Sequence, residues 1–315
     1  MEIGYSLSSE EMAPDAMVRN ARRAEETGFA GISVSDHFHP WTDRQGQSPF
    51  VWSVLGAIAV VTDHINVGTG VTCPTVRTHP AVVAQAAATT AAMMPGRFFL
   101  GVGSGEALNE HVVGSRWPEI DVRLEMLEEA VEVLRLLWQG GTRSHHGRHY
   151  TVENARIYTL PAEPPPIIMS GFGPKATTVA ARIADGYFGT APEPDLVDHY
   201  REAGGRGPAL ALMKVCWGED EEAARKLAHE LWPTIGVGGE LSQELPTPAH
   251  FEQAADRVTI DEVADTISCG PDPEQHLTSI RKYADAGYDR LFIQQIGADQ
   301  EGFFRFYAEE ILPKV

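Results

Sequence analysis

Residues 29–41 read FAGISVSDHFHPW, a short apolar segment followed directly by polar and chemically reactive side chains. The segment Gly31–Ser35 has the length and apolar character of a buried strand. Asp36, His37 and Trp41 lie within six residues of its end. These side chains either form an ordinary polar loop or belong to an active site, and the rest of the chain distinguishes the two.

The same pairing of a short apolar segment with an amphipathic one recurs along the 315 residues. In Arg123–Gln139, apolar residues are spaced three and four positions apart, which is typical of a helix with one buried face. The predicted strands are Ile3–Leu7, Gly31–Ser35, Ile65–Thr69, Phe98–Val102, Ile167–Ser170, Gly186–Gly189, Ala209–Trp217 and Arg290–Gln295. The predicted helices are Asp15–Glu26, Phe50–Val61, Ala81–Met94, Arg123–Gln139, Lys175–Ala184, Glu219–Leu231 and Glu274–Ala286.

This alternation predicts an α/β protein in which residues 1–315 form one (β/α)8 TIM barrel domain. Two insertions are expected, at about residues 140–166, with a small hairpin, and at about residues 233–259. A doubly wound sheet is the alternative architecture. Because a TIM barrel carries its active site on the loops that follow the strands, the position of Asp36–Trp41 favours a role in function.

Composition narrows the partners and the compartment. The formal net charge of −19 disfavours binding to nucleic acid or to anionic membranes. No apolar run is long enough to span a membrane, and the first residues lack the features of a signal peptide. The three cysteines are far apart, which suits a reducing cytoplasm. We therefore expect a cytoplasmic protein that acts on a small molecule.

Two further loops follow predicted strands, at residues 70–80 and 101–111. The glycines of the second loop do not have the GxGxxG spacing of a dinucleotide-binding fold. Glu106 and Asn109 lie at the start of a predicted helix. Glu106 is either a functional acid or a residue whose negative charge complements the helix dipole. His37 is a candidate general base, because its pKa is ordinarily close to neutral, although a lone histidine in a loop is often structural.

Two more motifs, the histidines at residues 145–149 and the turn at residues 170–173, have either a ligand-binding role or a purely structural one. His145, His146 and His149 have spacings seen in zinc sites, but no neighbouring cysteine completes a ligand set, and we predict no metal. Ser170, Gly171, Phe172 and Gly173 follow the fifth strand and precede a helix. Such a turn suits a phosphate group, and it is also an ordinary strand-to-helix connection.

Taken in order, SDHFHPW, GTGVTCPTVRTHPAVVAQ, FLGVGSGEALNEH and the CGPD segment from Cys269 resemble the F420-dependent glucose-6-phosphate dehydrogenase family. That family is the deazaflavin-using branch of the luciferase-like superfamily. The resemblance covers nearly the whole chain and implies a (β/α)8 barrel that uses coenzyme F420 to oxidise or reduce a small molecule. It also implies a homodimer.

The resemblance implies roles for individual residues. His37 would remove the proton of the substrate hydroxyl, and Glu106 would protonate or hydrogen-bond the N1 side of the reduced ring. Trp41, the third residue implied to be catalytic, would line the pocket and help to stabilise developing negative charge. The residues implied to contact the cofactor are Asp36, Gly70, Val71, Cys73, Gly105, Glu106, Asn109, Ser170, Gly171, Phe172 and Gly173. Among these, Asn109 and the turn at residues 170–173 would hold the ribityl-phosphate arm. Gly70–Val71 matches the position at which relatives have a non-prolyl cis peptide bond.

The sequence also departs from the family pattern. In relatives that use sugar phosphates, lysines hold the phosphate, whereas this chain has Glu193, near Thr190, and Gln253 at two such positions. An acid is unfavourable where a dianion binds, so we expect an alcohol or sugar substrate other than glucose 6-phosphate. An FMN-dependent monooxygenase or reductase, and a non-catalytic flavin-binding protein, are the alternative functions.

Overall fold

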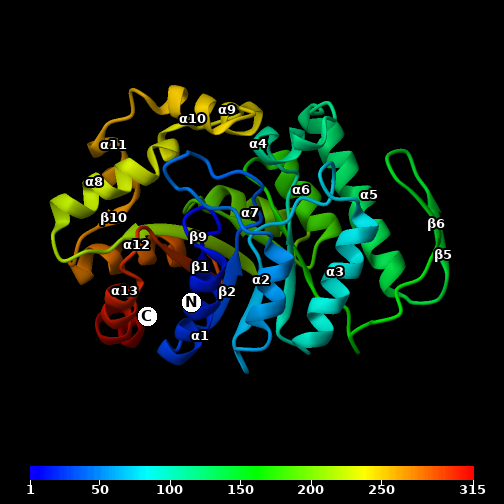
Figure 1. Ribbon diagram of the computed structural model, residues 1–315, viewed down its shortest axis with the longest axis horizontal. Helices are drawn as coiled ribbons and strands as arrows, with labels where there is room; N and C mark the ends of the chain where they lie inside the picture. The colour runs from blue at the N-terminus through cyan, green and yellow to red at the C-terminus, as the bar shows by residue number, and fades with distance from the viewer.

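The computed structural model describes residues 1–315, and its centre is a closed barrel of eight parallel strands (Figure 1). Around the ring the order is β11, β1, β2, β3, β4, β7, β8 and β9, and β9 closes the ring by pairing with both β8 and β11. These strands are β1 (Glu2–Leu7), β2 (Gly31–Val34), β3 (Asn66–Thr69), β4 (Phe98–Val102), β7 (Ile167–Ser170), β8 (Gly186–Gly189), β9 (Ala209–Cys216) and β11 (Arg290–Gln295). The predicted TIM barrel is therefore confirmed.

Helices surround the barrel because each has an apolar face that packs on the strands. They are α1 (Pro14–Thr27), α2 (Val51–Ile58), α3 (Pro80–Met93), α5 (Ile120–Trp138), α6 (Pro174–Ile183), α7 (Pro194–Glu202), α8 (Glu221–Leu231), α12 (Pro273–Asp285) and α13 (Gln300–Phe306). After α13 the chain ends in a π-helical turn (Tyr307–Ile311) and a 3₁₀ turn (Leu312–Lys314). The sequence prediction missed α7, which buries only Val197 and Tyr200. It also extended the second helix to Val61, whereas α2 ends at Ile58.

Aromatic side chains pack against one another inside the barrel. Phe188 and Phe292 stack with ring centroids 5.9 Å apart, and Phe99 lies 6.0 Å from Phe292. Glycines on neighbouring strands make room for these rings, since a Cβ atom at Gly68 would come within 2.4 Å of the Phe99 ring. The interior is therefore packed, and open space is left to the end of the barrel at which the strands finish.

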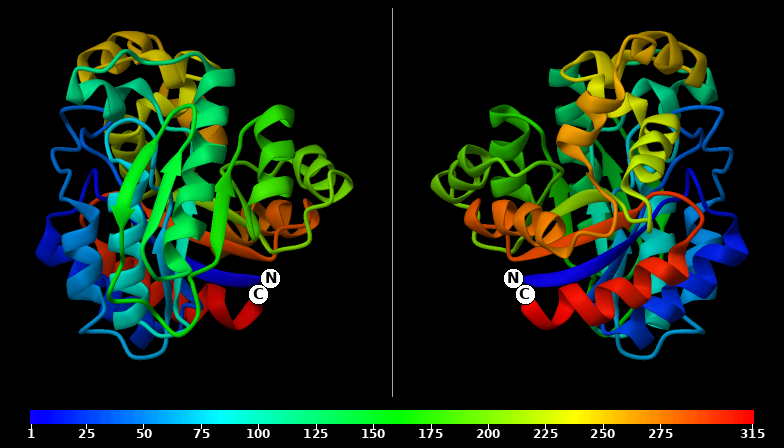
Figure 2. Two further views of the ribbon diagram at one scale, coloured as in Figure 1. Left: turned by 90° about the vertical axis from the view of Figure 1, so that its right-hand side faces the viewer. Right: turned by 90° about the vertical axis from the view of Figure 1, so that its left-hand side faces the viewer.

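Both predicted insertions contain secondary structure. The first has the predicted hairpin, β5 (Arg143–His146) and β6 (Thr151–Ala155), which projects from the barrel beside α5 in Figure 1. The second contains η2 (Pro233–Gly236), α9 (Leu241–Glu244) and α10 (Pro248–Ala255). The sequence prediction missed α11 (Ile260–Thr266) and the two-residue β10 (Ser268–Cys269) that follow. Figure 2 shows this yellow-to-orange segment above the ends of the barrel strands.

Candidate active site

Small residues surround half of the barrel mouth. The residue that directly follows β2, β3, β4 and β7 is Ser35, Gly70, Gly103 and Gly171, respectively. These four strands are neighbours in the barrel, so four small residues stand side by side at their ends. A planar ring system can approach the backbone closely at such a surface.

His37 lies in the loop after β2, close to carboxylates from the loops after β1 and β4. Its Nε2 atom is 3.5 Å from Oε1 of Glu10 and 3.7 Å from Oε1 of Glu106. Both distances exceed those of ordinary hydrogen bonds. The ring of Trp41 packs beside the imidazole, with centroids 5.1 Å apart. Two carboxylates and a tryptophan therefore surround the nitrogen that we expect to act as a base.

Glu10 is a site residue that the sequence interpretation missed. It lies three residues after the end of β1, as His37 lies three residues after the end of β2, so the same rule applied to the first strand would have found it. Its carboxylate accepts hydrogen bonds from Ser35 at 2.7 Å and from Ser8 at 2.9 Å. Burial opposes ionisation, but attraction to His37 and these hydroxyls outweigh it and lower the pKa of Glu10.

Asn109 lies between His37 and Glu106, two of the three residues predicted to be catalytic. Its Oδ1 atom accepts hydrogen bonds from the backbone N–H groups of Phe38 and His39, which fixes the orientation of its amide. The amide nitrogen then lies 2.5 Å from Oε1 of Glu106 and 3.0 Å from Nδ1 of His37. We expected Asn109 to hold a phosphate-bearing arm, and the structure places it between the acid and the base.

The tautomer of His37 decides whether Nε2 has a free lone pair. Nδ1 lies 3.1 Å from the carbonyl oxygen of His39 and 3.0 Å from the amide nitrogen of Asn109. A proton on Nδ1 is donated to the carbonyl and leaves Nε2 able to accept a proton. A base at Nε2 requires this tautomer.

A buried arginine joins the three loops that follow β2, β3 and β4. Nη2 of Arg77 lies 2.9 Å from Oδ1 of Asp36, and its Nε lies 3.4 Å from Oε1 of Glu110. The backbone N–H of Arg77 donates to Glu110 at 2.7 Å, and Thr72 donates to Asp36 at 2.9 Å. Both oxygens of Asp36 are therefore engaged inside the protein, one residue before His37.

Glu110 is expected to make stability depend on pH. Burial raises the pKa of Glu110 to about 7, although Arg77 opposes the shift. The stability that this group contributes is present below its unfolded pKa of about 4.3 and is lost as the pH rises through about 7. We expect wild-type stability to fall by about 3 kcal/mol relative to Glu110→Gln between pH 4.5 and pH 8, at 1.36 kcal/mol per tenfold change. Urea unfolding of both proteins across this range measures the difference, and parallel curves would contradict it.

The predicted loop at residues 70–80 makes close contacts with the loop that follows β4. The Gly70–Val71 peptide bond is cis, as the resemblance implied. The Cys73 thiol is buried and lies 2.9 Å from the hydroxyl of Thr75. Gly105 has a φ of +78°, and a Cβ atom there would come within 2.6 Å of the Cys73 sulfur. Cys73 and Gly105 thus pack against each other beneath the mouth.

The turn at residues 170–173 connects β7 to α6, with Gly173 as the N-cap of the ten-residue helix. A Cβ atom at Gly173 would meet nothing within 4 Å, and Phe172 is 59% exposed. This open helix N-terminus suits an anionic group. Together with the small residues of the mouth, it fits a flat ring that carries a phosphate-bearing arm.

The residues predicted to contact substrate lie in different settings. Thr190 and Glu193 are exposed in the loop after β8, and Glu193 caps α7. Gln253 lies on the exposed face of α10. Phe251, on the buried face of the same helix, contacts the Trp41 ring edge-on at 5.0 Å. The second insertion therefore meets the site through Phe251 and the cluster of Val237 and Ala255 around it.

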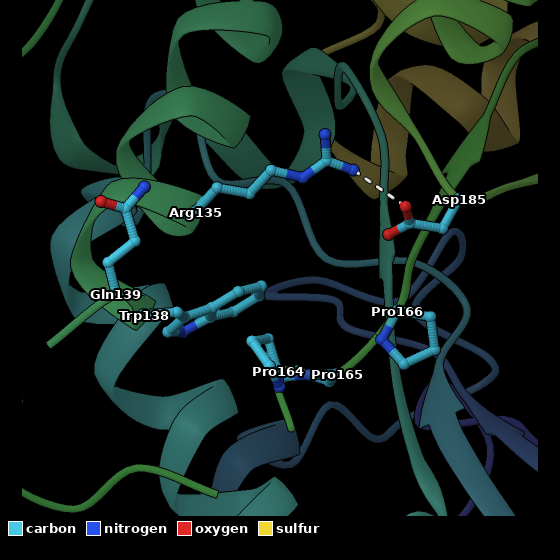
Figure 3. Close-up of a pocket in the computed structure, with 7 residues that line it drawn as sticks. All are labelled: Arg135, Trp138, Gln139, Pro164, Pro165, Pro166 and Asp185. Carbon is cyan, nitrogen blue, oxygen red and sulfur yellow. Dashed lines mark hydrogen bonds and ion pairs between the residues drawn. The ribbon is translucent and has the colours of Figure 1, made fainter. Parts of the chain in front are cut away.

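A cavity of about 450 Å³ lies away from these residues, at the beginning of β7 and β8 (Figure 3). It is lined by Arg135, Trp138, Gln139, Pro164, Pro165, Pro166 and Asp185. Arg135 and Asp185 pair at 3.1 Å across it. The histidines of the hairpin lie elsewhere, with His145 and His149 paired to Glu129 and Glu125 on α5. No helix is long and apolar enough to cross a membrane.

Comparisons with known proteins agree with this geometry. A family model described as luciferase-like monooxygenase matches residues 1–290. F420-dependent glucose-6-phosphate dehydrogenases of Microbacterium testaceum and Nakamurella multipartita are each 37% identical, covering all of this chain and 97% and 96% of those proteins. A solved F420-dependent secondary alcohol dehydrogenase, in complex with an F420–acetone adduct, has a TM-score of 0.92 and 30% identity, with 98% of each chain covered.

Proposed function

We propose the function of this chain on the premise that it belongs to the luciferase-like monooxygenase family and, within it, to the family of F420-dependent glucose-6-phosphate dehydrogenases. It is a coenzyme F420-dependent oxidoreductase. The relatives reported above depend on F420, so we retain F420, and not FMN, as the cofactor. We infer that the reacting carbon of the substrate bears a hydroxyl group, or a carbonyl group in the reverse direction.

The observation that carries this proposal is the convergence of Glu10, Glu106 and Trp41 on Nε2 of His37. Bound F420 supplies a ring carbon, C5, that accepts a hydride or returns one. The protein then has to orient the substrate, remove its hydroxyl proton and balance the charge. A base beside an acid, next to a mouth open to a flat ring, meets these needs.

His37 acts as the general base in alcohol oxidation. With the proton of the neutral ring on Nδ1, Nε2 accepts the hydroxyl proton, and the imidazole becomes positively charged. Glu10, 3.5 Å from Nε2, stabilises that charge. Trp41 holds the imidazole from the side and forms a wall of the substrate space.

Glu106 acts on the cofactor side of the same site. Its side chain is 24% exposed, whereas that of Glu10 is 4% exposed, so Glu106 is the carboxyl group that a ligand can reach. Asn109 fixes its position by a hydrogen bond of 2.5 Å. Asp36, Gly70, Val71 and the turn at residues 170–173 form the surrounding surface.

Glucose 6-phosphate is expected to be a poor substrate. The mouth carries Glu10, Glu11 and Glu106, and the loop after β8 presents Glu193 at a position where the family resemblance implies a lysine. A phosphate dianion is repelled by these acids. We expect kcat/KM for glucose 6-phosphate to be at least about 100-fold below that for the best neutral alcohol, the equivalent of about 2.7 kcal/mol.

The test is a fluorescence titration with F420 beside FMN, followed by initial rates with secondary alcohols, sugars and glucose 6-phosphate. F420 binding with turnover of neutral hydroxyl compounds supports the proposal. Tight binding of FMN alone would contradict the cofactor assignment. Turnover of glucose 6-phosphate at the rate of the best alcohol would contradict the substrate assignment.

We propose that the whole chain works as one barrel domain and forms a homodimer through α2 and α3. These neighbouring helices contain no charged residue, although 22% of the chain is charged. Three apolar residues on or beside these helices are exposed to solvent: Val60 (75%), Val82 (55%) and Met93 (43%). An uncharged, apolar face of this kind is typical of a subunit interface. The three free cysteines support a cytoplasmic location.

Val82→Glu is expected to weaken the dimer, because it places a charge in the apolar face. Sedimentation or light scattering at several protein concentrations measures the change, and we expect at least a tenfold increase in the dimer dissociation constant, about 1.4 kcal/mol. Val113→Glu is the matched control, since Val113 is 50% exposed outside these helices. Equal masses for all three proteins would contradict this interface.

A further inference from the structure

Lys214 is a cation in the barrel mouth with no hydrogen bond or ion pair to the protein. It lies on β9, in register with Gln294 on β11, so the two side chains point to the same side of the barrel wall. Its ammonium lies 4.4 Å above the ring of Trp232. That contact leaves its three N–H donors available. A largely buried ammonium in this state gains from an oxygen that a ligand supplies.

Two carboxylates, Glu10 and Glu11, act on Lys214 by their charge, but neither forms an ion pair with it. Glu11 is already engaged, since it accepts hydrogen bonds from Trp232 at 2.6 Å and from the backbone N–H of Gly297 at 2.9 Å. Burial lowers the pKa of Lys214, and the charges of Glu10 and Glu11 oppose that shift. The two acids thus favour the charged ammonium and leave its donors unused.

Lys214 and His37 face the same space. Glu10 lies 3.5 Å from Nε2 of His37, and its charge also acts on Lys214. Trp41, which packs on His37, also packs against the apolar cluster that contains Trp232. His37, through Trp41, and Lys214, through Trp232, therefore adjoin the same apolar cluster.

We propose that Lys214 binds a second oxygen of the substrate, so that the natural substrate is a neutral polyhydroxy or hydroxycarbonyl compound and not a simple alcohol. This inference rests on the proposed function of the site. The mouth contains three carboxylates, Glu10, Glu11 and Glu106, against one ammonium, so a neutral oxygen is favoured over an anionic one. Donation from Lys214, with Glu10 beside it as an acceptor, is a typical arrangement for a hydroxyl group.

The test compares matched alcohols that differ by one hydroxyl. Propane-1,2-diol, butane-1,3-diol and pentane-1,4-diol are paired with propan-2-ol, butan-2-ol and pentan-2-ol, and kcat/KM is measured from the loss of F420 absorbance. In at least one pair we expect the wild type to prefer the diol by roughly 10- to 100-fold, the range of a hydrogen bond to a charged group. Lys214→Met should abolish that preference through a higher KM for the diol and leave the simple alcohol within about twofold.

Lys226→Met is the matched control, because Lys226 is exposed on α8 and pairs only with Glu222. Lys214→Gln, which keeps a donor without the charge, provides a second variant if Lys214→Met folds poorly. Equal kcat/KM within every pair in the wild type, or equal losses for both members of a pair in the variant, would overturn the role of Lys214 and leave the proposed function intact.

A binding measurement separates the two ideas if no alcohol is turned over. Tryptophan fluorescence of the F420-loaded protein is titrated with the same diols. Diol binding that Lys214→Met removes would support Lys214 while contradicting the proposed reaction. Absence of diol binding to the loaded wild-type protein would overturn the inference.

Discussion

Replacement of His37 by alanine is expected to lower kcat for alcohol oxidation by about 10²–10⁴-fold, the usual contribution of a positioned general base. Nε2 faces Glu10 and Glu106 at 3.5 and 3.7 Å, and no other histidine has these neighbours. F420 affinity should change little, because the cofactor surface is formed mainly by backbone and small residues. Initial rates and F420 fluorescence titrations of the same preparation measure the two effects separately.

His39→Ala is the matched control for this prediction. His39 belongs to the same loop, but its Nδ1 atom lies 2.9 Å from the carbonyl oxygen of Leu108, away from the carboxylates. We expect a change of only a few fold in kcat, and added imidazole should restore part of the activity of His37→Ala alone. A His37→Ala enzyme that keeps more than a tenth of the wild-type kcat would show that another group removes the proton.

Arg77→Met is expected to destabilise the protein by about 3–5 kcal/mol, the typical cost of removing one partner from a buried ion pair. The change leaves the carboxylates of Asp36 and Glu110 without their cation, at sites that are 6% and 0% exposed. Activity should fall as well, since Asp36 precedes His37 and Glu110 shares a short helix with Asn109. Urea unfolding gives the stability, and rates below the unfolding transition give the activity.

Arg19→Met is the control, because Arg19 pairs with Asp15 on the surface at 2.5 Å, with both side chains about two-thirds exposed. Exposed pairs contribute about 0–1 kcal/mol. Burial raises the pKa of Glu110 and Arg77 opposes this, so the loss in Arg77→Met should be smaller near pH 5, where Glu110 is protonated. A loss below about 1 kcal/mol at pH 8 would contradict the structural role of Arg77.

The fold was predictable because its signal is local. Each barrel strand is a short apolar segment, the seven predicted helices all lie at helices of the structure, and the longest of them, α5, has apolar residues three and four positions apart. Segments whose structure depends on tertiary contacts were missed. The strand β10 has only two residues and exists because it pairs with β9, and α7 has a buried face of two side chains.

The site was predictable in part for a similar reason. Residues that follow a strand, such as His37 and Glu106, are placed at the mouth by the barrel itself. Their partners come from other strands, and no spacing in the sequence relates them. Glu10 lies 27 residues before His37, Lys214 faces the mouth from β9, and Arg77 joins loops through contacts at 2.9 and 3.4 Å. The resemblance implied that Asn109 holds the phosphate-bearing arm of the cofactor, and the structure shows its amide donating to Glu106 and lying 3.0 Å from Nδ1 of His37.

The central claim is that this chain moves a hydride between a hydroxyl-bearing carbon and F420. The most direct measurement is a single turnover of the F420-loaded protein with a secondary alcohol or diol that carries deuterium on the carbinol carbon. We predict bleaching of F420, deuterium in the reduced cofactor and a slower rate than with the undeuterated compound. F420 that stays oxidised while bound, with every hydroxyl compound tested, or reduced cofactor that contains no deuterium, would contradict the claim.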